Sequence, residues 1–228
     1  MAKGSRRLYA KAIMFDIDGT LFDSRDAFYF MIRDVFAQRE WALPDRGDVL
    51  KLIGRTNDYI ADALVPPESK YPDAVREWST TVEKLWIDEY LPKYVRMYPK
   101  ALEALTELDR RGFKLAVVTN GSSREIPLYL EQGGVTKLVD LVVTADDVGR
   151  PKPDPEILDF ARAKLSVEKK DCVYVGDTWM DAKAAERAGL RCVLVTWGID
   201  SRADLEAQTH AALVSSFDEL LDLLALAG

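Results

Sequence analysis

Residues 12–20, Ala12-Ile13-Met14-Phe15-Asp16-Ile17-Asp18-Gly19-Thr20, decide the fold more than any other stretch of the chain. The first four residues are apolar, as in a buried strand, and two aspartates follow at once. Side chains two apart in a strand point to the same side, so Asp16 and Asp18 can converge, and Gly19 lets the backbone turn tightly. Paired carboxylates favour Mg²⁺, which prefers oxygen ligands. A turn that merely ends a strand is the alternative interpretation.

The composition of the 228-residue chain argues against several classes of protein. A net charge of −7 disfavours nucleic-acid binding, because such binding relies on clustered Lys and Arg. The one basic cluster, residues 3–7, is interpreted as a solvated tail. No apolar run is long enough to cross a membrane, and no apolar signal-peptide core follows the basic residues. We therefore expect a cytoplasmic protein without nucleic-acid or membrane partners.

The cysteines and the single histidine narrow the possible chemistry. Cys172 and Cys192 each lie in an apolar run, which predicts buried free thiols instead of a disulfide framework or metal ligands. His210 is the sole histidine and lies in a polar stretch. The sequence therefore disfavours catalysis by a Ser-His or Cys-His pair. Acid–base chemistry must therefore use carboxylates or lysines.

Short apolar runs alternate with helical patterns, which predicts an α/β fold with a parallel sheet covered by helices. The expected strands are residues 11–15, 114–118, 141–143, 172–175 and 192–195, with a weaker edge strand at 212–214. The expected helices are residues 100–111, 123–132, 155–165, 180–188 and 217–226. Gly112 and Gly189 are predicted to cap helix ends, and Asp154 with Pro155 to begin one.

Residues 24–98 break this alternation, because they hold most of the aromatic side chains and no convincing strand. Helices are expected at residues 24–41, 57–64 and 73–90, with prolines, Pro72 among them, between them. We predict a small all-helical domain of residues 24–98 over the sheet edge. The remaining core domain comprises residues 1–23 and 99–228. The aromatic side chains of the insertion are expected to build its own small core.

Polar side chains follow four of the predicted strands, at the edge where open α/β sheets bind ligands. After the second strand, Thr119, Asn120, Gly121 and Ser122 offer a hydroxyl and N–H groups to a phosphate at a helix start. Capping of that helix is the alternative interpretation. Lys152 follows the third strand between prolines that restrict the backbone. It is predicted to meet a phosphoryl oxygen or a carboxylate, with an exposed loop lysine as the alternative.

Asp177 and Asp181 follow the fourth strand and are four residues apart. A helix that starts there would place both carboxylates on one face, where like charges need a nearby cation. An N-cap role accounts for Asp177 alone. The pair therefore favours a functional role in which a cation or a lysine lies near both carboxylates.

These motifs resemble those of the haloacid dehalogenase superfamily, and within it the phosphatases with a helical cap inserted after the first motif. The matching segments are Asp16-Ile17-Asp18-Gly19-Thr20-Leu21, Val118-Thr119-Asn120, Lys152-Pro153-Asp154-Pro155 and Gly176-Asp177-Thr178-Trp179-Met180-Asp181. The resemblance covers nearly the whole chain. It implies a Rossmann-like parallel sheet with helices on both faces.

The resemblance also implies a role for each motif residue. Asp16 would be the nucleophile that forms an aspartyl-phosphate, and Asp18 the general acid and base. Thr119 would bind the transferring phosphoryl group with Asn120 and Gly121 beside it, and Lys152 would neutralise that group and hold Asp16. Mg²⁺ would be held by Asp16, by the backbone carbonyl of Asp18 and by Asp177, with Asp181 in support directly or through water.

We therefore expect a Mg²⁺-dependent phosphatase of small phosphorylated metabolites, similar to phosphoglycolate phosphatases, that acts as a monomer or homodimer. The dehalogenases of the superfamily lack an aspartate at the position of Asp18, which disfavours a 2-haloacid dehalogenase. The β-phosphoglucomutase-like members tend to carry a histidine where Phe28 stands, which disfavours a phosphomutase. A non-catalytic sensor of a phosphorylated ligand is the alternative from another class.

Arg55 is the residue of the insertion that we expect to contact the substrate. It follows a glycine in Ile53-Gly54-Arg55-Thr56, and a guanidinium there can grip a carboxylate or a second phosphate. A solvated arginine is the alternative interpretation.

Overall fold

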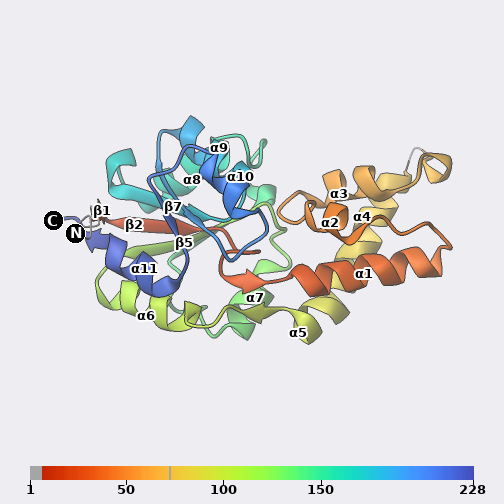
Figure 1. Cartoon of the computed structure of the whole chain (residues 1–228), viewed down its shortest axis with the longest axis horizontal. Coiled ribbons are helices and arrows are strands. Elements are labelled where there is room, and N and C mark those ends of the chain that lie inside the picture. Colours follow the sequence, from red (N-terminus) through yellow and green to blue (C-terminus); the bar gives the residue numbers. More distant parts are fainter. Residues whose placement is uncertain (1–6, 72) are drawn as a thin grey trace.

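A six-stranded parallel sheet forms the centre of the computed structural model, which describes residues 7–71 and 73–228 (Figure 1). The strand order is β6-β5-β2-β7-β8-β9. The strands are β2 (Ala12–Phe15), β5 (Lys114–Val118), β6 (Leu141–Val143), β7 (Cys172–Gly176), β8 (Arg191–Val195) and β9 (Ala212–Val214). All the predicted strands of the sheet are therefore confirmed, and β2 lies between β5 and β7.

Helices cover both faces of the sheet, because successive side chains of a strand point to opposite faces. Ile13 and Phe15 pack on one face against α6 (Ala101–Arg110), α7 (Ile126–Gln132) and α11 (Phe217–Leu223). Ala12 and Met14 pack on the other face against α8 (Glu156–Leu165), α9 (Trp179–Ala188) and α10 (Arg202–Glu206). Burial of both faces explains why these strands read as continuous apolar runs. Cys172 and Cys192 are buried free thiols, as predicted.

A group of helices extends from the carboxyl edge of the sheet, at the right of Figure 1. The chain leaves the sheet through β3 (Phe22–Asp23) and returns through β4 (Arg96–Met97), and these two short strands pair antiparallel. Between them lie α1 (Arg25–Gln38), α2 (Arg46–Leu50), α3 (Asn57–Leu64), a 3₁₀ turn (Pro67–Ser69), α4 (Ala74–Leu85), a π-helical turn (Trp86–Tyr90) and α5 (Leu91–Tyr94). We call residues 24–98 the cap segment. Strand β4 was not predicted, because a two-residue strand has no readable periodicity.

The ends of the chain differ from the prediction. The last helix ends at Leu223 instead of residue 226, and Leu224–Leu226 form β10, which pairs in parallel with β1 (Leu8–Ala10). Local sequence favours a longer helix, but the backbone of β1 offers a partner far away in the sequence. Both strands lie at the end of the molecule opposite the cap segment (Figure 1). Residues 3–6 of the basic cluster, and Pro72, lie outside the described residues.

Some helix starts also differ from the prediction. Helix α7 begins at Ile126 instead of residue 123, because Glu125 Oε1 accepts the Ser122 N–H at 2.7 Å and closes a turn ahead of the helix. Pro155 is the N-cap of α8, while Asp154 Oδ1 accepts the Glu156 N–H at 3.0 Å. Gly189 caps α9 with a φ of 69°, as predicted. Among the described residues, no helix has the length and apolar composition that a membrane crossing needs.

Candidate active site

The carboxyl ends of β2 and β7 bring three aspartates together. Phe15 is level with Val175 in the sheet, so the chain leaves both strands at the same height. Asp16, Asp177 and Asp181 are buried, and each offers a carboxylate oxygen within 4.8 Å of the others. We call these three residues the aspartate cluster.

Lys152 provides a positive charge inside this cluster. Its Nζ lies 2.8 Å from Asp16 Oδ1 and 2.7 Å from Asp181 Oδ1, and its side chain is 2 % exposed. The interpretation as an exposed loop lysine is therefore wrong. Burial raises the pKa of Asp16 to about 7, although the Lys152 ammonium lowers it. Burial also opposes ionisation of Asp181, but the same ammonium holds the pKa of Asp181 below its usual value.

Tyr174 joins this group although the sequence did not single it out. Its hydroxyl lies 2.8 Å from Lys152 Nζ and 3.0 Å from Asp181 Oδ1, and 3.1 Å from the carbonyl oxygen of Val118. The residue sits inside β7, where an aromatic side chain is typical of a core position. Its hydroxyl fixes the ammonium and the carboxylate relative to each other.

Asp177 is held tightly by backbone and side-chain donors. Thr20 Oγ1 donates to its Oδ1 at 2.9 Å, and the Ile199 N–H donates to its Oδ2 at 2.7 Å. A Cβ atom at Gly19 would lie 2.1 Å from Asp177 Oδ2, and one at Gly198 would lie 2.2 Å from it. Gly19 also has a φ of +79°. The glycine of the first motif is thus needed both for the turn and for the approach of this carboxylate.

Asp181 caps the start of α9 in addition to being part of the aspartate cluster. Its Oδ2 accepts hydrogen bonds from the Thr178 N–H at 3.0 Å and the Thr178 hydroxyl at 2.7 Å, as the third residue of a capping box for α9. The helix begins at Trp179, so Asp177 precedes it and the predicted shared helix face is wrong. The two carboxylates converge because the chain turns between β7 and α9.

The aspartate cluster is a candidate cation site. Among the described residues, the ammonium of Lys152 is the one positive charge that contacts the cluster of three buried carboxylates, and buried charge needs a compensating partner. Burial and the nearby Asp181 raise the pKa of Asp177 well above its usual value. A donor set made only of oxygen atoms fits a divalent cation such as Mg²⁺.

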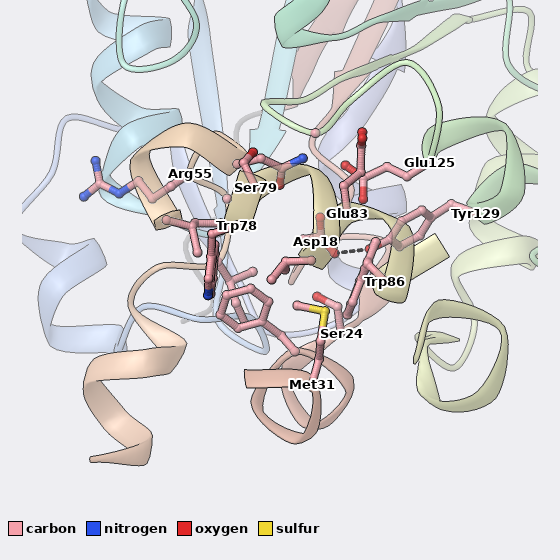
Figure 2. Close-up of a pocket in the computed structure, with 17 residues that line it drawn as sticks. Asp18, Ser24, Met31, Arg55, Trp78, Ser79, Glu83, Trp86, Glu125 and Tyr129 are labelled. Atoms are coloured by element: carbon pink, nitrogen blue, oxygen red, sulfur yellow. Dashed lines mark hydrogen bonds between the residues drawn. The ribbon is translucent and has the colours of Figure 1, made fainter. Parts of the chain in front are cut away.

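Asp18 lines a cavity between the sheet and the cap segment, where Figure 2 shows its carboxyl group facing Tyr129. Its Oδ1 accepts a 2.7 Å hydrogen bond from the Tyr129 hydroxyl, a partner that the sequence did not reveal. Burial raises the pKa of Asp18, while Ser24 and Tyr129 lower it. The two aspartates of the first motif therefore have different partners, because Lys152 contacts Asp16 and Tyr129 contacts Asp18.

The second motif holds the neighbouring loops in place. Thr119 Oγ1 accepts the Gly121 N–H at 3.1 Å. Asn120 Nδ2 donates to the carbonyl oxygens of Lys152 at 2.9 Å and Gly54 at 3.0 Å, and Asn120 Oδ1 accepts the Lys152 N–H at 2.8 Å. Because α7 begins only at Ile126, these residues lie in a turn and not at a helix start.

Arg55 connects the cap segment to the core. Its guanidinium carbon lies 4.8 Å from the ring centre of Tyr59 and 5.0 Å from that of Trp179 on α9. The guanidinium is turned away from Asp18 (Figure 2). Arg55 therefore makes a cation–π contact across the interface, and its predicted substrate contact stays a prediction.

Comparison with known proteins agrees with this geometry. Residues 13–195 match the family described as haloacid dehalogenase-like hydrolase. The chain belongs to this family. The resemblance expected from the four motifs is thereby confirmed.

Named relatives of this haloacid dehalogenase-like hydrolase are phosphatases. It is 30 % identical over 217 residues to the probable phosphatase IndB of Dickeya dadantii, covering 92 % of this chain and 91 % of that protein. It is 29 % identical over 221 residues to a phosphoglycolate phosphatase of Rhodobacter capsulatus, covering 92 % and 95 %. A predicted phosphoglycolate phosphatase of Haemophilus somnus has a similar crystal structure, with a TM-score of 0.85 at 24 % identity over 93 % of this chain and 96 % of that chain. This likeness confirms the fold.

Proposed function

We propose that the chain is a Mg²⁺-dependent phosphatase that hydrolyses small phosphorylated metabolites through a phosphoryl group on Asp16. The observation that carries this proposal is the 2.8 Å contact of Lys152 Nζ with Asp16 Oδ1 inside the buried aspartate cluster. The ammonium favours the ionised carboxylate, which is the nucleophilic form. The phosphatase names of the relatives support the same reaction.

The residues divide the chemistry between them. Asp16 Oδ forms a bond to phosphorus while the bond from phosphorus to the leaving alcohol oxygen breaks, and Asp18 gives that oxygen a proton. Asp18 then takes a proton from the water that attacks the phosphorus and releases Asp16. Lys152 and the hydroxyl and backbone N–H groups of Thr119 to Gly121 neutralise and orient the phosphoryl oxygens. Bound Mg²⁺ would add positive charge against the phosphate, held by Asp16, Asp177, Asp181 and the Asp18 carbonyl.

The proposal treats residues 24–98 as a cap domain and residues 1–23 and 99–228 as the catalytic core. The short crossings at β3 and β4 support this division. A cytoplasmic location is part of the proposal and is supported by the free thiols of Cys172 and Cys192.

Phosphate release tests the proposal. We expect the protein to release inorganic phosphate from p-nitrophenyl phosphate and from a panel of phosphorylated metabolites with MgCl₂, and to stop in EDTA. Asp16→Asn should abolish release, whereas the exposed control Asp109→Asn should retain it. Release that persists in EDTA or in Asp16→Asn would overturn the proposal. Isomerisation of a sugar phosphate, halide release from 2-haloacids, or ligand binding without release would favour a phosphomutase, a dehalogenase or a sensor instead.

Thermal unfolding tests the metal site without relying on turnover. A cation that binds only the folded state raises Tm as its concentration increases. At 100 times its Kd, it adds about 2.7 kcal/mol to the free energy of unfolding. We expect this rise with MgCl₂ in the unaltered protein and in Asp109→Asn. Asp177→Asn should lose most of it, and an equal rise in that variant would exclude the aspartate cluster as the site.

A further inference from the structure

The cavity beside Asp18 is lined by carboxylates and aromatic rings (Figure 2). Glu125 lies ahead of α7, Glu83 lies on α4, and the rings of Trp78 and Trp86 come from the cap segment. Among the described residues that line the cavity, Arg55 is the only cation, and its guanidinium is stacked on the rings of Tyr59 and Trp179. A substrate carboxylate would therefore meet three carboxyl groups here, those of Asp18, Glu83 and Glu125.

Glu83 and Glu125 differ in whether a basic side chain pairs with the carboxyl group. Glu83 Oε2 lies 2.9 Å from Arg124 Nη1, a partner that reaches it from the solvent side. Glu125 is only 7 % exposed, and among the described residues it pairs with no Lys or Arg. Its Oε1 accepts the Ser122 N–H at 2.7 Å. Burial and the neighbouring Asp18 raise the pKa of Glu125 to about 8, although the Ser122 N–H and the Trp86 side chain lower it. A hydrogen-bond donor or a cation in the cavity would give this buried carboxyl group the basic partner that it lacks among the described residues.

Ser24 provides an independent sign that a ligand belongs in the cavity. Its hydroxyl lines the cavity beside Asp18, whose pKa it lowers, and the residue is 1 % exposed. Within the described parts of the chain, no group donates a hydrogen bond to Ser24 Oγ. A hydroxyl or ammonium of a ligand would satisfy it.

The size of the cavity limits what it can hold. It offers about 50 Å³ to the centres of water-sized molecules, and one water needs roughly 10–15 Å³ by that measure. The cavity thus holds on the order of four waters, which corresponds to an alcohol of a few heavy atoms. A small leaving group therefore fits the cavity.

We propose that the substrate is the phosphate monoester of a small alcohol that carries a hydrogen-bond donor, an ammonium or a second hydroxyl, and no carboxylate. This inference rests on the proposed phosphatase function. Glu125 and Ser24 accept the donor of the leaving group, while the aromatic rings cover its carbon atoms. The same lining disfavours an anionic leaving group, because it presents three carboxyl groups and, among the described residues, no cation except the stacked guanidinium of Arg55.

Substrate selectivity tests this inference. Phosphoethanolamine and 2-phosphoglycolate are matched in size and differ in the charge of the leaving group, and glycerol 3-phosphate adds the hydroxyl class. We expect kcat/KM for phosphoethanolamine or for glycerol 3-phosphate to exceed that for 2-phosphoglycolate at least tenfold, and the better of the two identifies the donor. Glu125→Gln should reduce this ratio about tenfold, whereas Glu131→Gln, on the exposed side of α7, should leave it unchanged. A preference for 2-phosphoglycolate, or a ratio that Glu125→Gln does not alter, would overturn the inference.

Binding separates a failure of this inference from a failure of the phosphatase proposal. Trp78 and Trp86 line the cavity, so ligands that enter it should change the tryptophan fluorescence of the Asp16→Asn variant in MgCl₂. Tighter binding of a donor-bearing ester than of 2-phosphoglycolate supports the inference even if the protein releases no phosphate. Equal or weaker binding overturns it, even if the protein is an active phosphatase.

Discussion

The hydroxyl of Tyr129 donates a 2.7 Å hydrogen bond to Oδ1 of Asp18 in the lining of the cavity. The bond links α7 to the turn that follows β2 and fixes the orientation of the carboxyl group. Phe22 supports this arrangement, because its ring packs edge-on against Tyr129 at 5.2 Å between ring centres. Tyr129 therefore positions the group that we propose as the general acid.

Tyr129→Phe should slow hydrolysis in a way that depends on the leaving group. A general acid contributes most when the leaving alcohol is a poor one. We expect kcat to fall about tenfold for an alkyl phosphate such as glycerol 3-phosphate, and about twofold or less for p-nitrophenyl phosphate. Steady-state kinetics with both substrates measure the difference. Equal losses for both would show that Tyr129 has only a structural role.

Lys152→Met should destabilise the protein strongly when no metal is bound. The substitution keeps most of the side-chain volume but leaves Asp16 and Asp181 buried without their ammonium. Removing one partner of a buried ion pair costs about 3–5 kcal/mol. Urea unfolding in EDTA measures this loss. Lys183→Met is the control, because Lys183 pairs with Glu186 at the surface, and its urea midpoint should barely change. Similar urea midpoints for the two variants would contradict the conclusion that the Lys152 ammonium stabilises the buried carboxylates of Asp16 and Asp181.

Gly19→Ala should impair catalysis beyond its effect on the backbone. Gly19 and Gly134 both have positive φ angles, +79° and +69°, but only at Gly19 would a Cβ collide with Asp177. Both substitutions carry a left-handed backbone cost of about 1–2 kcal/mol. We expect Gly19→Ala to lose activity about 10–100-fold through displacement of a metal ligand, and Gly134→Ala to retain nearly full activity. Comparable kcat/KM values for the two variants would contradict this account of Gly19.

Arg55 and Trp179 should act as a pair if their contact holds the cap segment on the core. A cation–π contact contributes about 0.5–2 kcal/mol, so Arg55→Leu and Trp179→Leu should each raise KM a few-fold. The double variant should be no worse than either single one, because both remove the same contact. A large effect of Arg55→Leu beside a negligible effect of Trp179→Leu would instead indicate that Arg55 binds the substrate.

The sheet and the aspartate cluster could be predicted because their signals are local. Strands buried on both faces are continuous apolar runs, and Asp16 and Asp177 each follow such a run directly. Lys152 could be singled out because prolines surround it. The strand order explains which residues Lys152 meets, because it places β2, which precedes Asp16, beside β7, which precedes Asp177 and Asp181.

Residues that act through distant partners could not be predicted. Tyr174 and Tyr129 occupy positions where an aromatic side chain is typical of a core, and only their hydroxyl partners reveal a role in the site. Glu125 looked like an ordinary residue of a helix start, and its position beside Asp18 depends on the packing of α7. Strand β10 could not be predicted for the same reason, because its partner β1 lies at the other end of the chain.

The central claim is that Asp16 carries the phosphoryl group during turnover. Mass spectrometry of protein quenched in acid during hydrolysis tests this claim most directly. We predict that the peptide containing Asp16 gains the mass of one phosphoryl group, that the gain requires Mg²⁺, and that Asp16→Asn abolishes it. Phosphate release during turnover with no modified Asp16, or with the modification on another residue, would contradict the mechanism.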